Sequence, residues 1–84
     1  MQMIQTPNSS NINRFGHDGI DLFIEFKKSL AVYSYSSVPR EVYHAMHAAE
    51  SVGVFFAANI KKPYVCLKLS VMEAREKGFE ALEV

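Results

Sequence analysis

The sequence predicts a small α+β domain, in which an antiparallel β-meander carries two to three short helices packed on one face. Residues 20–26 alternate apolar and polar side chains, which is typical of a half-buried strand. Residues 30–35 are rich in β-forming residues, and residues 39–49 repeat apolar side chains at helical spacing. With 84 residues, of which 49% are hydrophobic and 21% charged, the chain suits one core.

Residues 1–8 are polar and end in a Pro-Asn pair, so they are interpreted as a flexible lead-in. The domain itself is expected over residues 9–69, and a C-terminal helical extension over residues 70–84. Its first strand is predicted at residues 11–15. A turn rich in glycine and aspartate, residues 16–19, then leads into the alternating strand.

A hairpin joins the alternating strand to the β-rich segment after it, and the loop length decides where two tyrosines point. With a two-residue tip at residues 28–29, Ile24 pairs with Tyr33, so Tyr33 and Tyr35 join the apolar face. With a three-residue tip, both rings lie beside Phe23 on the opposite face, as a platform for stacking bases. The buried arrangement is favoured, because short tips are common and aromatic residues of small domains usually pack in the core.

Pro39 predicts the start of a helix, because a first-turn residue has no intrahelical partner for its N–H. A second short helix is predicted over residues 54–60 and a further strand over residues 64–69. A capping box at residues 70–73 introduces a third helix over residues 71–77. The expected core consists of the apolar residues that face inward in these elements: Ile20, Leu22, Ile24, Phe26, Val32, Val42, Ala45, Met46, Phe55, Phe56 and Leu67.

The charge balance excludes some partners. Nine basic residues offset nine acidic ones, so no global positive field favours strong duplex DNA binding. The N-terminus has neither a basic start nor an apolar run, which predicts a cytoplasmic protein without a membrane partner. The single cysteine, Cys66, fits a reducing compartment.

Several short motifs follow one another in a fixed order over about residues 9 to 67. They are Ser9-Ser10-Asn11-Ile12, Gly16-x-Asp18, Leu22-x-x-x-Phe26, Tyr33-x-Tyr35, Val38-Pro39, Val42-Tyr43, Ala48-Ala49-Glu50-Ser51, Gly53 and Phe55-Phe56. This ordered set resembles the KTSC domain family. The family takes its name from its place at the C-terminus of some lysyl-tRNA synthetases, and it also occurs as free-standing proteins of bacteria and phages. The resemblance implies RNA binding only through that attachment, and it implies no established activity. The chain departs from the family at Ala57, where asparagine is usual, and at the hairpin tip, which lacks the usual glycine-rich turn.

Candidate ligand-binding residues are polar or cationic side chains near the ends of the predicted elements. Arg40 precedes the first helix and Lys61 and Lys62 end the second, so together they could hold one or two phosphates. The alternative is a solvated surface with lysines at a helix end. Ser10 and Asn11 serve either a ligand or the strand-start turn. The aromatic hydroxyls complete the candidate set: Tyr33, Tyr35 and Tyr43.

No metal or cofactor is expected, although His44 and His47 have the spacing of two ligands on one helix face. A zinc site needs three or four ligands, and Cys66 is better interpreted as a small buried apolar residue of its strand. The sequence contains no nucleophile elbow, phosphate-binding glycine loop or paired carboxylate motif, so the protein is expected not to be an enzyme.

The leading functional hypothesis is therefore a non-enzymatic binding module for RNA or a nucleotide-like ligand, using local cations and aromatic hydroxyls. The alternative is a phage or prophage accessory protein that forms a homo-oligomer and binds a host protein or sequesters a small nucleotide signal. The oligomer is expected to form through residues 70–84, whose apolar side chains have no partner in the predicted domain: Val71, Met72, Phe79 and Leu82.

Overall fold

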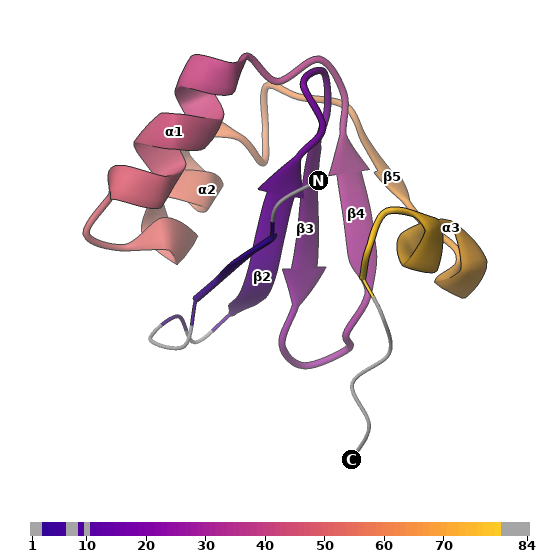
Figure 1. Cartoon of the computed structure of the whole chain (residues 1–84). Helices are drawn as coiled ribbons and strands as arrows, with labels where there is room; N and C mark the ends of the chain where they lie inside the picture. The colour runs from indigo at the N-terminus through magenta and orange to yellow at the C-terminus, as the bar shows by residue number, and fades with distance from the viewer. Residues whose placement is uncertain (1–2, 7–8, 10, 80–84) are drawn as a thin grey trace.

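The structure, a computed structural model, describes residues 3–6, 9 and 11–79, and its elements form one five-stranded antiparallel sheet with three helices (Figure 1). The strands follow one another across the sheet in chain order, from β1 to β5. The α+β class is therefore confirmed. The elements are β1 (Met3–Gln5), β2 (Ile12–His17), β3 (Leu22–Phe26), β4 (Val32–Tyr35), α1 (Arg40–Ala48), α2 (Val52–Asn59), β5 (Cys66–Lys68) and α3 (Val71–Glu76).

The β1 strand lies where the sequence predicts a flexible lead-in. Ile4 pairs with Phe15 of β2, and the hydroxyl of Thr6 donates to the carbonyl of Ile12 at 2.5 Å. The lead-in prediction is wrong for residues 3–6, because three strand residues are too few to show an alternating pattern. The other residues of the predicted lead-in, residues 1–2 and 7–8, lie outside the described residues.

The β3–β4 hairpin has the register predicted from a two-residue tip. Ile24 pairs with Tyr33 and Leu22 with Tyr35, so both tyrosines share the apolar face of the sheet. The loop itself is longer than predicted, because Phe26 closes it by donating its N–H to the carbonyl of Ala31 at 3.0 Å. The predicted tip and the observed loop both contain an even number of residues, and either length leaves the same side chains on the same face. The predicted register is therefore right, although the predicted loop length is wrong.

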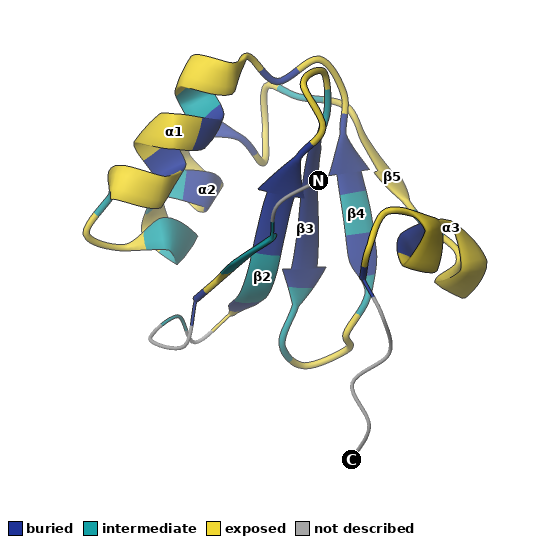
Figure 2. Cartoon of the chain, in the orientation of Figure 1, coloured by how far each residue is buried: buried dark blue, intermediate teal, exposed yellow. Residues whose placement is uncertain are grey.

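Two helices cover one face of this sheet, as predicted. Figure 1 shows α1 and α2 together beside the sheet, and Figure 2 shows that α1 exposes its outer side while the central strands are buried. The main core lies between these two helices and the sheet, and its side chains are almost fully buried. Its buried members are Ile12, Phe15, Leu22, Ile24, Tyr35, Val38, Tyr43, Met46, Phe56 and Ile60.

The opposite face of the sheet carries a second, smaller core beneath α3. Phe23 and Val32 project from this face and pack against Ala74 and Phe79. Ser70 and Glu73 form the predicted capping box, with hydrogen bonds of 3.0 and 3.1 Å. Two α3 carbonyls are then satisfied past the helix end, since Gly78 N–H donates to Arg75 O and Phe79 N–H to Ala74 O, both at 2.9 Å. This Schellman arrangement requires a positive φ, which is +100° at Gly78, and brings Phe79 back onto Ala74.

The two ends of the described chain meet on this second face. Met3 packs against the second core, and its Cε lies 3.4 Å from where a Cβ on Gly78 would be. The sequence does not predict this face, because Phe23 and Val32 occupy the positions of an alternating strand that usually face water.

Three residues of the predicted core are exposed. Ile20 is 67% exposed, because Asp18 Oδ1 accepts the N–H groups of Ile20 and Asp21 and makes a turn that ends before β3. Leu67 is 63% exposed because β5 is an edge strand. Ala45 is exposed on the outer side of α1, where Tyr43 and Met46 supply the buried contacts.

Candidate functional site

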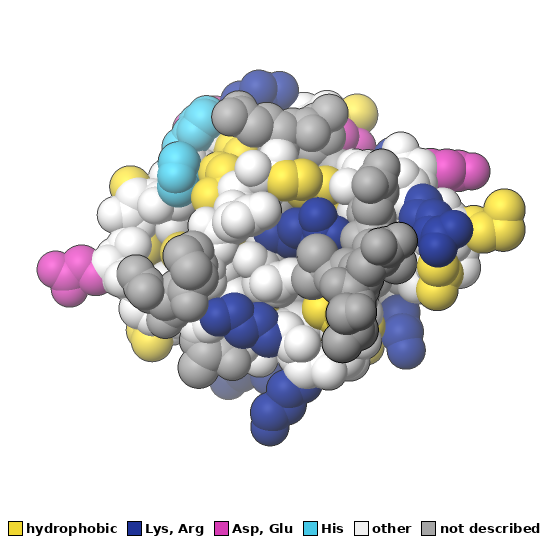
Figure 3. Space-filling view, turned by 60° about the horizontal axis from the view of Figure 1, so that its bottom comes forward, with side chains coloured by type: hydrophobic (Ala, Val, Ile, Leu, Met, Phe, Trp, Pro, Cys, Tyr) yellow, Lys and Arg dark blue, Asp and Glu magenta, His cyan; other side chains and the backbone are white. Residues whose placement is uncertain are grey.

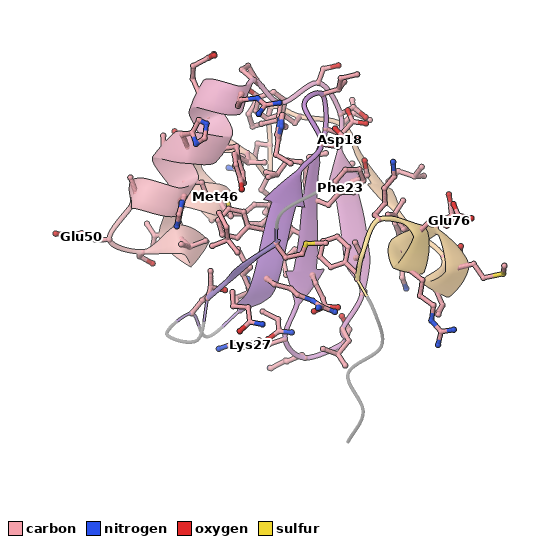
Figure 4. The ribbon with its side chains drawn as sticks, in the orientation of Figure 1. Asp18, Phe23, Lys27, Met46, Glu50 and Glu76 are labelled. Atoms are coloured by element: carbon pink, nitrogen blue, oxygen red, sulfur yellow. The ribbon has the colours of Figure 1, made fainter. Side chains whose placement is uncertain are left out.

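A pocket of about 400 Å³ opens between β1 and the corner where α1 leads into α2. Its walls come from two segments of the chain that are distant in sequence, and they contain both polar and apolar side chains. Figure 4 shows Met46 on the side of α1 that faces the sheet and Glu50 past the end of that helix, turned away from the sheet. We call this cavity the β1–α2 pocket. It is lined by Ile4, Gln5, Thr6, Ser9, His47, Glu50, Ser51 and Val52.

Two hydroxyls of the pocket can donate a hydrogen bond to a ligand. Ser9 Oγ accepts the N–H groups of Asn11 and Ile12 at 3.3 and 3.0 Å, and Ser51 Oγ accepts the N–H of Val54 at 3.3 Å. A serine hydroxyl has one proton and two acceptor positions, so each of these groups keeps its proton for another acceptor. The pocket therefore suits a ligand that presents oxygen acceptors.

The first turn of α2 adds further hydrogen-bond donors to the pocket. Ser51 is the N-cap residue and Val52 the first helical residue, and both line the pocket. The first N–H groups of a helix have no intrahelical acceptor and carry a partial positive charge. The helix start also lies close to the loop after β1, because a Cβ on Gly53 would lie 3.6 Å from Ser9 Oγ. Donors from the loop and from the helix thus converge at one place.

The loop that supplies Ser9 is held to the sheet. Lys27 Nζ donates to the carbonyl of Ser9, and the N–H of Lys27 donates to the carbonyl of Asn11 at 2.8 Å. Asn11, a predicted ligand residue, is exposed directly beside this loop and is not part of the pocket wall. Ser10, also predicted, lies outside the described residues.

The predicted tyrosines Tyr33 and Tyr35 lie in the main core. Tyr35 is 4% exposed and packs edge-on against Phe56, with ring centroids 5.3 Å apart, while Tyr33 is half-buried against Phe26. Burial, with smaller contributions from Cys66 and Tyr33, raises the pKa of Tyr35 to about 12. The prediction that these rings face inward is confirmed, and they form no stacking platform.

Tyr43 and Arg40 lie together at the start of α1, away from the pocket. The Tyr43 ring stacks on His17 with centroids 5.3 Å apart, and burial raises the pKa of Tyr43 although the nearby Arg40 lowers it. Lys61 and Lys62 are exposed past the end of α2. Arg40 is exposed as well, at the first residue of α1.

Two further cations among the described residues lie beside carboxylates. Arg14 is paired with Glu25, with Nε 2.8 Å from Oε1, and Lys77 lies 3.8 Å from Asp18. Figure 3 shows Lys and Arg side chains on the face seen from below, separated by uncharged atoms. Such a distribution offers single contacts to a small anion better than a track for a long nucleic acid.

The histidines of α1 make ring contacts. His44 lies against Tyr43 and His47 against Phe15, with centroids 5.3 and 6.5 Å apart. Among residues 3–6, 9 and 11–79, no three of His, Cys, Asp and Glu gather closely enough to hold a metal ion. In the same part of the chain, no helix has the length and apolar character needed to cross a bilayer.

The sequence does not predict the pocket as a site, although several of its residues stand in recognisable motifs. Ser9, Glu50 and Ser51 belong to two of the short motifs that carry the family resemblance, and the spacing of His47 indicates only a metal ligand. The signal that could have found the pocket is that these two motifs meet at one place in space. Their meeting depends on β1 and on the turn between α1 and α2, neither of which the sequence pattern fixes.

Comparison with known proteins gives a consistent result. Residues 8–64 match the KTSC domain. A crystal structure of a KTSC domain protein from Yersinia pestis superposes with a TM-score of 0.72 and 32% sequence identity, and the match covers 82% of this chain and 100% of that one. No curated protein sequence matches this chain.

Proposed function

The chain belongs to the KTSC domain family, and on that premise we propose that it is a non-enzymatic binding module that holds a nucleotide-like ligand in the β1–α2 pocket. The observation that carries this proposal is the convergence of Ser9, Ser51 and the start of α2 on one cavity. Residues of two family motifs thereby supply the donors of the same pocket.

The size and chemistry of the pocket favour a nucleotide-sized ligand. A volume of about 400 Å³ lies within the range of sites that enclose small organic ligands. Phosphate oxygens suit the donors at the start of α2, since helix N-termini bind anions. Ile4 and Val52 offer apolar surface to a base, and the His47 ring adds an aromatic edge. Glu50 at the rim suits the hydroxyls of a ribose.

A single nucleotide fits these features better than a long RNA. The two core tyrosines offer no platform for successive bases, and the pocket walls enclose one site. A pocket of this kind would also serve a phage or prophage protein that sequesters a small nucleotide signal. We place the protein in the cytoplasm within the same proposal, because the exposed thiol of Cys66 persists best in a reducing compartment.

Calorimetric titration with mono-, di- and cyclic nucleotides and with a short single-stranded RNA tests the proposal. We expect saturable binding of at least one nucleotide, weakened at least 10-fold by Val52→Phe, which fills the pocket from the first residue of α2. Val54→Phe is the matched control, because Val54 is 68% exposed on the same helix and does not line the pocket.

A second pair of variants tests the polar wall. His47→Ala should weaken binding, whereas His44→Ala, one turn earlier on α1, should leave it unchanged. Arg40→Ala tests the predicted basic site instead. No saturable signal for any nucleotide at low salt would overturn the proposal. Binding that Arg40→Ala abolishes and Val52→Phe leaves unchanged would move the site to the start of α1.

A further inference from the structure

The outer edge of β5 presents backbone groups that point away from the sheet. Ser36 N–H donates to Val65 O at 2.9 Å, and Leu69 N–H donates to Val32 O at 2.8 Å. Because hydrogen bonding alternates along an antiparallel strand, residues 65, 67 and 69 bond toward β4. The peptide groups of Cys66 and Lys68 therefore point outward, where β5 is the last strand of the described sheet. Another extended strand is the partner that such groups fit.

Exposed apolar side chains lie beside this edge. Leu67 is directly opposite Ser34 and therefore lies on the face of the sheet that carries the second core, with Val65 on the same face. Figure 1 shows α3 next to β5, and Val71 and Met72 of that helix are also exposed. We call these four residues the β5 edge patch; their exposed fractions are Val65 76%, Leu67 63%, Val71 68% and Met72 74%.

We propose that the β5 edge pairs with β5 of a second copy of this chain, antiparallel, about a two-fold axis through Leu67. A second β5 fits this edge because, with Leu67 at the centre, all the outward-pointing groups of Cys66 and Lys68 find partners in the other copy. In the two-fold arrangement, the N–H and C=O groups of Cys66 bond those of Lys68 in the other copy, and the reverse. Lys68 of each copy then lies opposite Cys66 of the other, so the two ammonium groups do not face each other directly.

The exposed apolar area is sufficient for this pairing. A two-fold interface uses the same patch twice. Four largely exposed apolar side chains on each copy would remove on the order of 1,000 Å² from water in total, which is about the minimum for a specific interface. The axis runs perpendicular to the sheet, so α3 of both copies lies on the same face and their exposed apolar residues can meet across the axis.

Two of the four residues predicted to join copies through the extension do not support that prediction. Phe79 is 3% exposed inside the second core, so it is not available to another chain. Leu82 lies outside the described residues. The pairing proposed here instead uses β5 and the start of α3, and it lies at the opposite sheet edge from the β1–α2 pocket. Either proposal can therefore fail without the other.

Disulfide trapping in full-length protein tests the register. In a Cys66→Ser background, Leu67→Cys places two thiols across a pair without backbone hydrogen bonds, where Cα atoms are about 4.5 Å apart. That separation permits a disulfide. We expect rapid formation of covalent dimer on mild oxidation. Val65→Cys in the same background is the control, since its two copies would lie about 14 Å apart. Unaltered Cys66, about 8 Å from its counterpart, should also fail to crosslink.

Sedimentation over a range of concentrations tests the association itself. The unaltered chain should reach dimer mass, and Leu67→Lys should lower the association constant at least 10-fold by placing two charges at the axis. Because Leu67 is 63% exposed, this variant should keep its circular dichroism spectrum, and Val54→Lys should still dimerise. A monomer at every concentration, or equal crosslinking of Val65→Cys and Leu67→Cys, would overturn the proposal.

Discussion

The His17 side chain connects the end of β2 to the start of α1. Its Nε2 lies 2.6 Å from the carbonyl of Val38, and its Nδ1 accepts the N–H of Gly19 at 3.0 Å. Because Nδ1 accepts this hydrogen bond, the ring proton lies on Nε2, which donates a hydrogen bond to the carbonyl of Val38. One buried imidazole thus fixes the β2–β3 turn, the entry into α1 and, through stacking, Tyr43.

Replacing His17 by phenylalanine should therefore destabilise the protein. The new ring would still stack on Tyr43, but the carbonyl of Val38 would lose the hydrogen bond from His17. Val38 as a residue is only 1% exposed, so water cannot readily replace that bond. An unsatisfied buried polar group costs about 1–3 kcal/mol, and we expect that loss in the free energy of unfolding measured with urea. His44→Phe, at an exposed position of α1, should change stability by less than about 0.5 kcal/mol. Equal stability of the two variants would contradict the role given to His17.

Tyr35 predicts a stability loss at high pH. Its pKa is raised from 10.0 to about 12, because burial disfavours the phenolate. The unfolded chain therefore releases the proton first, so stability from this group is fully present below pH 10 and is lost as the pH rises toward 12. Urea unfolding at a series of alkaline pH values checks the slope. Tyr35→Phe should flatten it, and an unchanged slope in that variant would assign the effect to other groups.

At the scale of single elements, the β3–β4 hairpin shows what local sequence can and cannot specify. Its register depends only on whether the loop has an even or an odd number of residues, so the positions of Tyr33 and Tyr35 could be predicted although the predicted loop was too short. The shape of its loop could not, because Leu30 adopts a φ of 54°, a conformation that nothing in a leucine residue favours. The surrounding strands hold that conformation.

Leu30→Gly should stabilise the protein by about 0.5–1 kcal/mol, because glycine adopts a positive φ without steric cost. The gain is limited by the greater freedom of glycine in the unfolded chain. Leu30→Ala is the matched control: it also shortens the side chain, which is 40% exposed as leucine, but it keeps the Cβ that causes the strain. Thermal unfolding of both variants measures the difference. A glycine variant no more stable than the alanine variant would show that the loop carries no strain.

At the scale of the whole molecule, the sheet carries apolar residues on both faces. The sequence predicts the face under α1 and α2, because the alternating apolar side chains of β3 and the apolar stripe along α1 each need a partner, and they pack against one another. The second face depends on α3 lying against it after β5 and on the Schellman turn at Gly78, which returns Phe79 onto Ala74. The β1–α2 pocket was beyond sequence reasoning for the same reason, since β1 and α2 meet only after the sheet is assembled.

Phe79→Ala should weaken the second core selectively. Phe79 is 3% exposed, and the guanidinium of Arg14 lies 5.4 Å from its ring centroid. Loss of a buried phenylalanine costs about 3–5 kcal/mol. Hydrogen exchange should accelerate in α3 more than in α1, while Glu76→Ala, at an exposed site of α3, should change neither. Uniform acceleration in both helices would show that the two cores unfold together.

The contact between Met3 and the Gly78 turn has a practical consequence for how the chain can be rewired. Since the two ends of the described chain lie side by side, a short peptide linker could join them, and new ends could open in the exposed β3–β4 loop. Such a circular permutant would keep every strand neighbour of the sheet. It would also place β1 and α3 next to each other in sequence, so that a contact between the two ends of the native chain would become a contact between neighbouring segments.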